Sequence, residues 1–208
     1  MKKKKILFIH QNFPGQFKSL APHLADLKNY EVFSLSWKKI NKSDIAKDND
    51  TFTNMDKVKH HQYTVTRSSS DNIFNLAQEF ETKMIRADAV AIKCKELKEK
   101  GLNPDLIIGH PGWGETIFLD EIWPDSKKIS YFEFYYNTKN SDIDFDSETK
   151  EINQHYLSTK LIARNAPLML PYLTSNKIIT PTKFQKSTAP DFIKNKIDVV
   201  HDGIDTEL

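Results

Sequence analysis

The chain has 208 residues with a formal net charge of +2, and 38% of them are hydrophobic while 28% are charged. This length suits one large domain with a substantial core, and the composition is ordinary for a soluble globular protein. The small net charge gives no reason to expect nucleic-acid binding, and no run approaches the ~18 apolar residues of a membrane-spanning helix. The single cysteine, Cys94, excludes an internal disulfide and fits a reducing compartment, so we expect a cytoplasmic protein.

Residues 2–5 are four consecutive lysines in front of the first apolar run. We interpret them as a solvated lead-in to the first strand, because the four apolar residues that follow are too few for a signal peptide. The alternative is peripheral contact with an anionic membrane surface, for example the inner face of the membrane. There each lysine adds about 1 kcal/mol.

The first third of the chain alternates apolar runs with helical spacing. Residues 15–28 predict a helix, in which Pro22 should either cause a bend or mark a short, irregular first turn. Residues 38–55 are polar and predict an irregular excursion. The strands predicted around them are residues 6–9, 31–37 and 58–66.

A long helix is predicted from an N-cap at Asp71 to a C-cap at Gly101. Apolar residues recur along it at helical spacing, which predicts one buried face. The residues of this predicted face are Phe74, Ala77, Phe80, Met84, Ala87, Ala91 and Cys94.

The remaining elements continue the alternation. Helices are predicted at residues 114–122 and 148–173, the second broken by Pro167 and Pro171, with an acidic loop at residues 137–148 before it. Short helical turns follow at residues 184–188 and 190–194, and the strands are residues 105–108, 128–134, 177–179 and 197–200. This pattern predicts an α/β fold: a Rossmann-like, doubly wound, mostly parallel sheet with helices on both faces.

Three of the predicted strands run into a histidine with a glycine close by. His10 follows residues 6–9, His110 follows residues 105–108 and Gly109, and His201 follows the last strand. The carboxyl ends of parallel strands meet at one edge of a sheet, where open α/β proteins bind ligands. The sequence therefore predicts one shared cleft.

Several familiar site types lack their sequence motif. The first strand is followed only by Gly15, without the G-x-G-x-x-G of a dinucleotide site, and there is neither a Walker lysine loop nor a G-x-S-x-G elbow. A metal site on the three histidines, with Asp202 or Glu115 as an oxygen ligand, is the less favoured alternative. No H-x-H or H-E-x-x-H spacing supports it.

Residues 131–136 form an aromatic stretch around one carboxylate. Phe132 and Phe134 point to one face of the predicted strand and are expected in the core. Glu133 points the other way and needs a partner there, because an unpaired buried carboxylate is costly. A lysine, an arginine or a sugar hydroxyl would serve, so structural pairing and ligand contact both stay open.

These motifs occur in one order along the chain. They are I-L-F-I-H-Q-N-F-P-G-Q-F at residues 6–17, G-H-P-G-W-G-E at 109–115, Y-F-E-F-Y-Y at 131–136 and H-D-G-I-D at 201–205. Together they resemble the N-terminal domain of glycosyltransferase family 4 enzymes, in the bacterial subgroup with the H-P-G-W-G-E and Y-F-E-F-Y-Y signatures. Residues 38–70 carry no matching signature.

The resemblance implies a GT-B enzyme, in which two Rossmann-like domains face each other across a cleft. Residues 1–200 would form the acceptor-side domain, and residues 201–208 would begin the crossover to a C-terminal nucleotide-sugar domain absent from this chain. Such enzymes typically retain anomeric configuration and need no metal or other cofactor. The implied partners are a nucleotide-sugar donor and a glycan or lipid-linked acceptor, as in polysaccharide biosynthesis, and the isolated domain should be inactive.

The resemblance also suggests site residues. His110 is the expected catalytic residue, and the cleft residues at the crossover are His201, Asp202 and Gly203. The expected substrate-binding residues are His10, Gly15, Gln16, Gly112, Trp113, Glu115, Glu133 and Tyr135. Backbone N–H groups of Gly15 and Gln16 at a helix start would stabilise a leaving diphosphate.

Alternatives stay open for two of these residues and for the function. Glu115 could instead favour the dipole at the start of the next helix, and Trp113 could pack beneath its loop rather than stack on a sugar. The alternative function is a stand-alone, non-catalytic sugar- or nucleotide-binding module.

Overall fold

The structure, a computed structural model, describes residues 2–37, 55–139 and 154–203. Nearly all of the excursion predicted at residues 38–55 and most of the acidic loop predicted at residues 137–148 lie outside these ranges. So do residues 204–208 of the predicted crossover.

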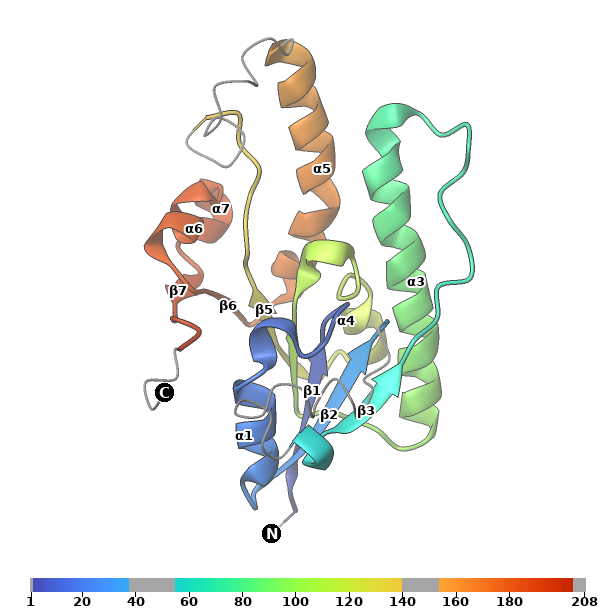
Figure 1. The fold of residues 1–208 in the computed structure, drawn as a ribbon, viewed down its shortest axis with the longest axis vertical. Helices are drawn as coiled ribbons and strands as arrows, with labels where there is room; N and C mark the ends of the chain where they lie inside the picture. Colours follow the sequence, from blue (N-terminus) through green and yellow to red (C-terminus); the bar gives the residue numbers. More distant parts are fainter. Residues whose placement is uncertain (1, 38–54, 140–153, 204–208) are drawn as a thin grey trace.

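The described residues form a seven-stranded sheet in the order β3-β2-β1-β4-β5-β6-β7, and every neighbouring pair is parallel (Figure 1). The order reverses between β1 and β4, which makes their carboxyl ends the topological switch point of the sheet. The Rossmann-like α/β fold is thus confirmed. The strands are β1 (Lys4–Ile9), β2 (Tyr30–Ser36), β3 (Lys59–Gln62), β4 (Leu106–Gly109), β5 (Lys127–Tyr131), β6 (Lys177–Thr180) and β7 (Ile197–Val199).

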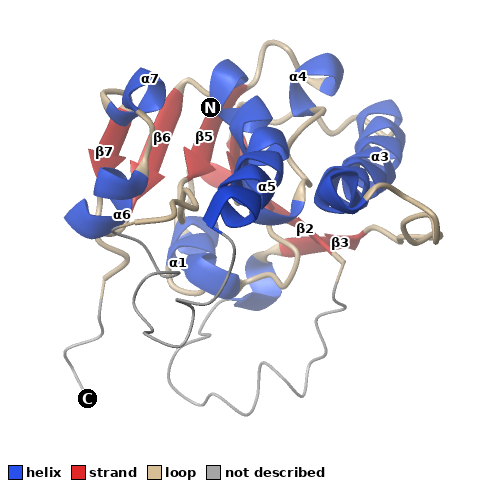
Figure 2. Cartoon of the chain, turned by 90° about the horizontal axis from the view of Figure 1, so that it is seen from above, coloured by secondary structure: helices blue, strands red, loops and turns tan. Residues whose placement is uncertain are grey.

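Helices cover both faces of this sheet, and Figure 2 shows α1 on one side and α3 on the other. The α-helices are α1 (Leu20–Asp26), α3 (Gln78–Glu99), α4 (Leu119–Ile122), α5 (Gln154–Thr174), α6 (Lys183–Thr188) and α7 (Asp191–Lys194). Short 3-10 helices are η1 (Gly15–Phe17), η2 (Met55–Lys57), η3 (Asn75–Ala77) and η4 (Pro111–Trp113).

The core follows the two-residue alternation of β1. Leu7 and Ile9 join the apolar cluster that includes α3 and α4, while Ile6 and Phe8 join the cluster on the α1 side. All four are buried, and each such side chain stabilises the fold by about 1.5–3 kcal/mol. A third cluster, around Phe132, packs α5, α6 and α7 against β6 and β7.

The long helix begins later than predicted. Its N-terminus is Gln78 rather than the residues after Asp71, and the 3-10 turn η3 precedes it. Phe74 is 72% exposed and Phe80 is 42% exposed, so their assignment to the buried face is wrong. Gly101 ends the helix at φ +91°, as the C-cap prediction required.

Two predicted breaks also differ from the structure. Helix α5 runs through both Pro167 and Pro171, so the prediction that they break it is wrong. Each proline removes one backbone donor, and the packing of buried Leu168 and Tyr172 against the fold outweighs that loss. Conversely, the helix predicted at residues 114–122 shortens to α4, because Gly114 ends η4 with φ +101°.

Candidate functional site

The switch point brings two of the three predicted histidines together. β1 and β4 pair with Ile9 opposite Gly109, so the next residues, His10 and His110, leave the sheet side by side. Their rings lie edge to face with centroids 5.1 Å apart, and both side chains are buried. This pair of imidazoles forms the centre of the site.

The three histidines share one local turn. In each, ring Nδ1 accepts a hydrogen bond from the backbone N–H two residues further on. The pairs are His10 with Asn12 (3.0 Å), His110 with Gly112 (3.2 Å) and His201 with Gly203 (3.1 Å). Because Nδ1 is the acceptor, the proton of each neutral ring sits on Nε2.

Glu133 is the partner of His110. The Nε2–H of His110 donates to Glu133 Oε2 at 3.1 Å, which lowers the pKa of this carboxyl. The Glu133 side chain is still 54% exposed. The partner that the sequence required is therefore a histidine, not a lysine or arginine, and part of the carboxylate stays open to solvent.

His10 is held neutral by its surroundings. Burial, and next the neighbouring His110, lower the pKa of His10 to about 4. A Cβ on Gly15 would lie 2.5 Å from the His10 ring, and one on Gly112 would lie 2.5 Å from the His110 ring. Each loop glycine therefore lets its backbone close over the adjacent imidazole.

The loop after β1 differs from its prediction. Gly15 and Gln16 belong to the three-residue η1, and α1 begins separately at Leu20. These two residues therefore do not open the helix that was predicted at residues 15–28. The Gln16 side chain is directed at the His10 ring and raises the pKa of His10, but by less than burial and His110 lower it. The backbone N–H of Gly112 is already engaged by His110.

Glu115 is buried on the α3 side of the sheet. Tyr63 donates its hydroxyl to Glu115 Oε1 at 2.8 Å, and Oε2 has no hydrogen-bond partner among the described residues. Burial raises the pKa of Glu115. Because α4 starts only at Leu119, with Phe118 as its N-cap, the structure does not support the alternative that Glu115 favours the dipole at a helix start.

Asp202, three residues after the end of β7, connects the last strand to the site. Tyr131 donates its hydroxyl to Asp202 Oδ2 at 2.9 Å, and the Tyr131 ring lies 5.7 Å from the His110 ring. His201 and Gly203 are exposed at the same carboxyl edge, but the ring contact between His10 and His110 does not include His201. Sequence reasoning missed Tyr131, although it shares strand parity with Glu133.

Arg86 on α3 is a second residue that sequence reasoning missed. Its guanidinium lies over two indoles, 5.1 Å from the Trp37 ring centroid and 5.7 Å from that of Trp113, and it donates to Gln11 Oε1. The predicted Trp113 is 45% exposed, so one part of its surface packs on arginine while another faces solvent. Apolar spacing along a helix predicts its buried face but gives no signal for a charged residue such as Arg86.

Tyr135 lies apart from the histidine pair. Its backbone N–H donates to Thr188 Oγ1 at 3.2 Å, and its ring packs against the cluster around Phe132. Phe134, expected in the core, is only half-buried and contacts Tyr136 and Phe184, because β5 has already ended at Tyr131.

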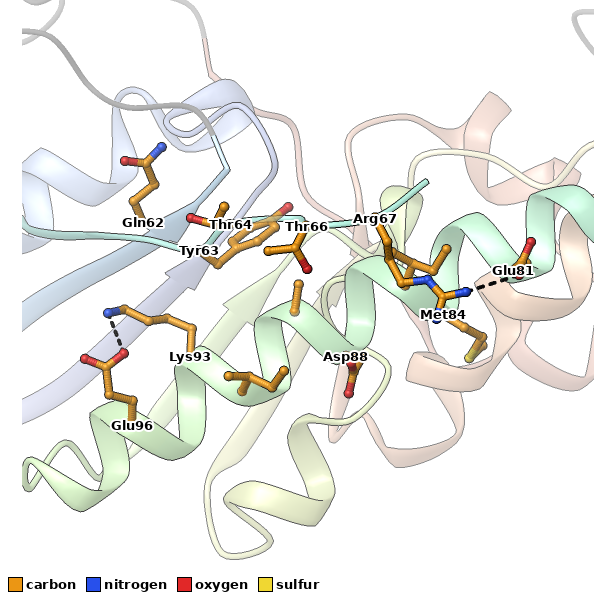
Figure 3. Close-up of a pocket in the computed structure, with 13 residues that line it drawn as sticks. Gln62, Tyr63, Thr64, Thr66, Arg67, Glu81, Met84, Asp88, Lys93 and Glu96 are labelled. Atoms are coloured by element: carbon orange, nitrogen blue, oxygen red, sulfur yellow. Dashed lines mark hydrogen bonds and ion pairs between the residues drawn. The ribbon is translucent and has the colours of Figure 1, made fainter. Parts of the chain in front are cut away.

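A hollow of about 580 Å³ lies between α3 and the segment after β3 (Figure 3). Charges of both signs line it: Arg67 reaches toward Glu81 at 3.8 Å, and Lys93 binds Glu96 at 2.8 Å. Within residues 2–37, 55–139 and 154–203, no three His, Cys, Asp or Glu side chains gather as metal ligands. No helix in the same ranges is long and apolar enough to span a membrane.

Comparison with protein families settles the membership of the chain. The model of the "Glycosyl transferase family 4 group" matches residues 41–208. The chain belongs to this family. Among curated proteins, none matches the sequence of this family 4 chain.

Solved structures similar to this family 4 chain share its fold at low sequence identity. One is a UDP-glucosyltransferase from Polygonum tinctorium (TM-score 0.58, 8% identity, 97% of this chain and 52% of that chain). Another is UGT71G1 of Medicago truncatula complexed with UDP-glucose (TM-score 0.57, 11% identity, 95% and 51%). A third is UGT2 of Phytolacca americana with UDP-2fluoro-glucose and pterostilbene (TM-score 0.52, 13% identity, 96% and 53%). The chain thus spans about half the length of each.

Proposed function

We propose that this family 4 chain is the acceptor-side half of a glycosyltransferase that moves a sugar from a nucleotide-sugar to a glycan or lipid-linked acceptor. The observation that carries the proposal is the cluster of His10, His110 and Glu133 at the topological switch point, where α/β folds bind ligands. Family membership and the fold shared with UDP-sugar transferases support it.

Within this proposal, His110 and Glu133 orient a sugar hydroxyl. The histidine donates Nε2–H to one carboxylate oxygen and so fixes the direction of the carboxylate. The exposed part of Glu133 keeps acceptor sites for an incoming hydroxyl. His10, neutral at physiological pH, adds a polar wall without adding positive charge.

The rest of the proposed machinery follows from the resemblance. The backbone of Gly15 and Gln16 would face the diphosphate that leaves, and Asp202, held by Tyr131, would border the crossover to a second, nucleotide-binding domain. Retention of configuration, independence from metal and other cofactors, and a cytoplasmic site at the membrane surface belong to the same proposal. This chain matches about half of the length of the solved transferases, which is the share expected of one domain in a two-domain enzyme.

A donor screen tests the activity. The whole protein to which this chain belongs is incubated with UDP-, GDP- and dTDP-sugars, and released nucleotide is measured. We expect release with one donor class, accelerated by an acceptor. Binding of a nucleotide-sugar with no release for any donor would favour the alternative, a non-catalytic binding module.

Variants of the central pair test the assigned residues. His110→Ala removes the hydrogen bond to Glu133 and should lower turnover about 100-fold, by analogy with the loss of one positioned donor. Glu133→Gln, at a half-exposed position, keeps the shape and should lower turnover with the circular dichroism spectrum unchanged. His23→Ala, exposed on α1, is the matched control. Parental turnover in both test variants would refute these roles.

A further inference from the structure

A second hollow, the Arg86 hollow, adjoins the histidine site. It has a volume of about 460 Å³ and lies between Trp37, the segment before η3 and the first turns of α3. It shares Thr66, Arg67 and Ile85 with the hollow of Figure 3. The lining residues that matter here are Trp37, Thr66, Arg67, Ser68, Thr82 and Arg86.

The charge of the Arg86 hollow is of one sign. Arg67 and Arg86 are its charged lining residues, whereas the neighbouring hollow also carries Glu81, Asp88 and Glu96. Within the described residues Arg86 makes no ion pair. An excess of guanidinium groups in a concave site favours an anionic ligand.

Arg67 has a carboxylate within ion-pair distance, whereas Arg86 has none among the described residues. Glu81 lies 3.8 Å from Arg67 and accepts hydrogen bonds at 2.9 Å from the backbone N–H and the hydroxyl of Ser70, which lower its pKa. It therefore stays charged and offsets part of the charge of Arg67, so Arg86 is the principal anion-binding group. Glu115 interacts electrostatically with Arg86, but burial raises its pKa and so disfavours its charged form.

The remaining lining suits a sugar ring. The Trp37 indole is 42% exposed and offers an apolar wall, while the exposed side chains of Thr66 and Ser68 offer hydroxyl groups. The Thr82 hydroxyl is already bonded to Gln78 O at 2.8 Å and to Ser69 Oγ at 2.6 Å. Apolar faces with a few placed polar groups are the usual composition of small-molecule sites. Trp37 is also held in place, because its backbone N–H donates to Gln11 O at 3.2 Å.

The Arg86 hollow is tied to the histidine site by direct contacts. Arg86 donates to the side chain of Gln11, the residue after His10, and its guanidinium lies over Trp113 in the loop after His110. A ligand held by Arg86 would therefore lie next to both histidine loops.

We propose that the Arg86 hollow binds an acidic or phosphorylated sugar of the acceptor, with its anionic group on Arg86 and Arg67 and its ring against Trp37. This proposal rests on the function proposed above and adds the chemical class of the acceptor. A guanidinium group binds a phosphate and a carboxylate through the same pair of hydrogen bonds. The test therefore uses one sugar of each kind to identify the anionic group.

Calorimetric titration of this chain tests the binding. The probes are glucose 1-phosphate, glucuronate and uncharged glucose. We expect at least one anionic sugar to bind at least ten times more tightly than glucose, and the better one identifies the anionic group. Equal binding of all three probes, or binding of none, would overturn the proposal.

Variants locate the bound anion. Arg86→Gln should weaken binding of the preferred anionic sugar about tenfold or more, the range of a lost charge-assisted hydrogen bond. Arg67→Gln, whose side chain is 66% exposed and safe for folding, should weaken it severalfold. Lys196→Gln removes the same charge at the exposed start of β7 and should change nothing. If both arginine variants bind as the Lys196 variant does, the anion is bound elsewhere.

Turnover assays separate this proposal from the function on which it rests. In the whole protein, Arg86→Gln should reduce transfer to an acidic acceptor far more than transfer to an uncharged acceptor. Equal loss of both reactions would contradict a role in acceptor choice. If the parental protein turns over no nucleotide-sugar, the proposed function fails, and the titration still decides whether the Arg86 hollow binds anions.

Discussion

At the scale of single residues, burial decides how the ionisable groups of the site behave. His10 and Glu115 are both buried, and burial disfavours the charged form of each, so it lowers the pKa of the histidine and raises that of the carboxyl. Glu133, half-exposed and bonded to His110, keeps its charge instead. The sequence shows which groups are ionisable, but their burial depends on contacts between distant strands.

The depressed pKa of His10 makes stability fall in acid. The unfolded chain takes up a proton near pH 6.5, while the folded chain resists it down to about pH 4. The contribution of His10 is therefore fully present above pH 6.5 and is lost as the pH falls through this window. Between pH 7.5 and 5.0 we expect it to remove about 2 kcal/mol from the free energy of unfolding.

Urea unfolding at both pH values measures this effect. His10→Gln should show a smaller loss of stability between pH 7.5 and 5.0 than the parental chain, whatever its stability at pH 7.5. His201→Gln, at an exposed position, should lose as much as the parent. An undiminished acid loss in the His10 variant would mean that other groups cause it.

At the scale of elements, the sequence predicted which strands and helices occur better than it predicted the residues at which they begin and end. All seven predicted strands occur. The interior strands β1 and β4 are apolar because both of their faces are buried, whereas the edge strand β3 is polar and was predicted from residues 58–66 as a strand with one polar face. The start of α3 was misplaced by several residues, since Asp71 and Phe74 fit a helix locally and only tertiary packing favours η3 there. The pairing of His110 with Glu133 could not be predicted, because it depends on β4 and β5 being neighbours in the sheet and on their register.

At Gly114 the loop after η4 packs closely against the backbone of α3. At φ +101°, a Cβ would lie 2.5 Å from the backbone oxygen of Lys83 on α3. Gly114→Ala should therefore lower the free energy of unfolding by about 3 kcal/mol or more, combining backbone strain with overpacking.

Gly101→Ala is the matched control, because φ is +91° there and a Cβ would meet nothing within 4 Å. It should lose only about 1–2 kcal/mol, the conformational cost alone. Thermal or urea unfolding compares the two variants. Equal losses would show that contact between the loop and α3 does not constrain this position.

At the scale of the whole molecule, the strand order sets the distribution of stability. β1 and β4 lie inside the sheet and carry buried residues on both faces, whereas β3 and β7 are its edges. Amide hydrogen exchange should be slowest in β1 and β4 and fastest, among the strands, in β3 and β7. Mass spectrometry of peptides from each strand measures this, and equal protection in β1 and β7 would contradict a core centred on the switch point.

Helix α5 contains two prolines in its second half, where its backbone hydrogen bonding is incomplete. Pro167 and Pro171 have no backbone N–H, so the carbonyls of Ala163 and Pro167 lack their usual partners four residues ahead. Bending there sacrifices no hydrogen bond that a straight helix would have kept. The end of α5 after Pro171 is held by buried Tyr172. The part before Pro167 is held by buried Asn165, which exchanges two hydrogen bonds with the backbone of Tyr136, and by Tyr156, which accepts one from Asn75. Contacts outside the helix, rather than its own backbone hydrogen bonds, therefore keep α5 straight at the two prolines.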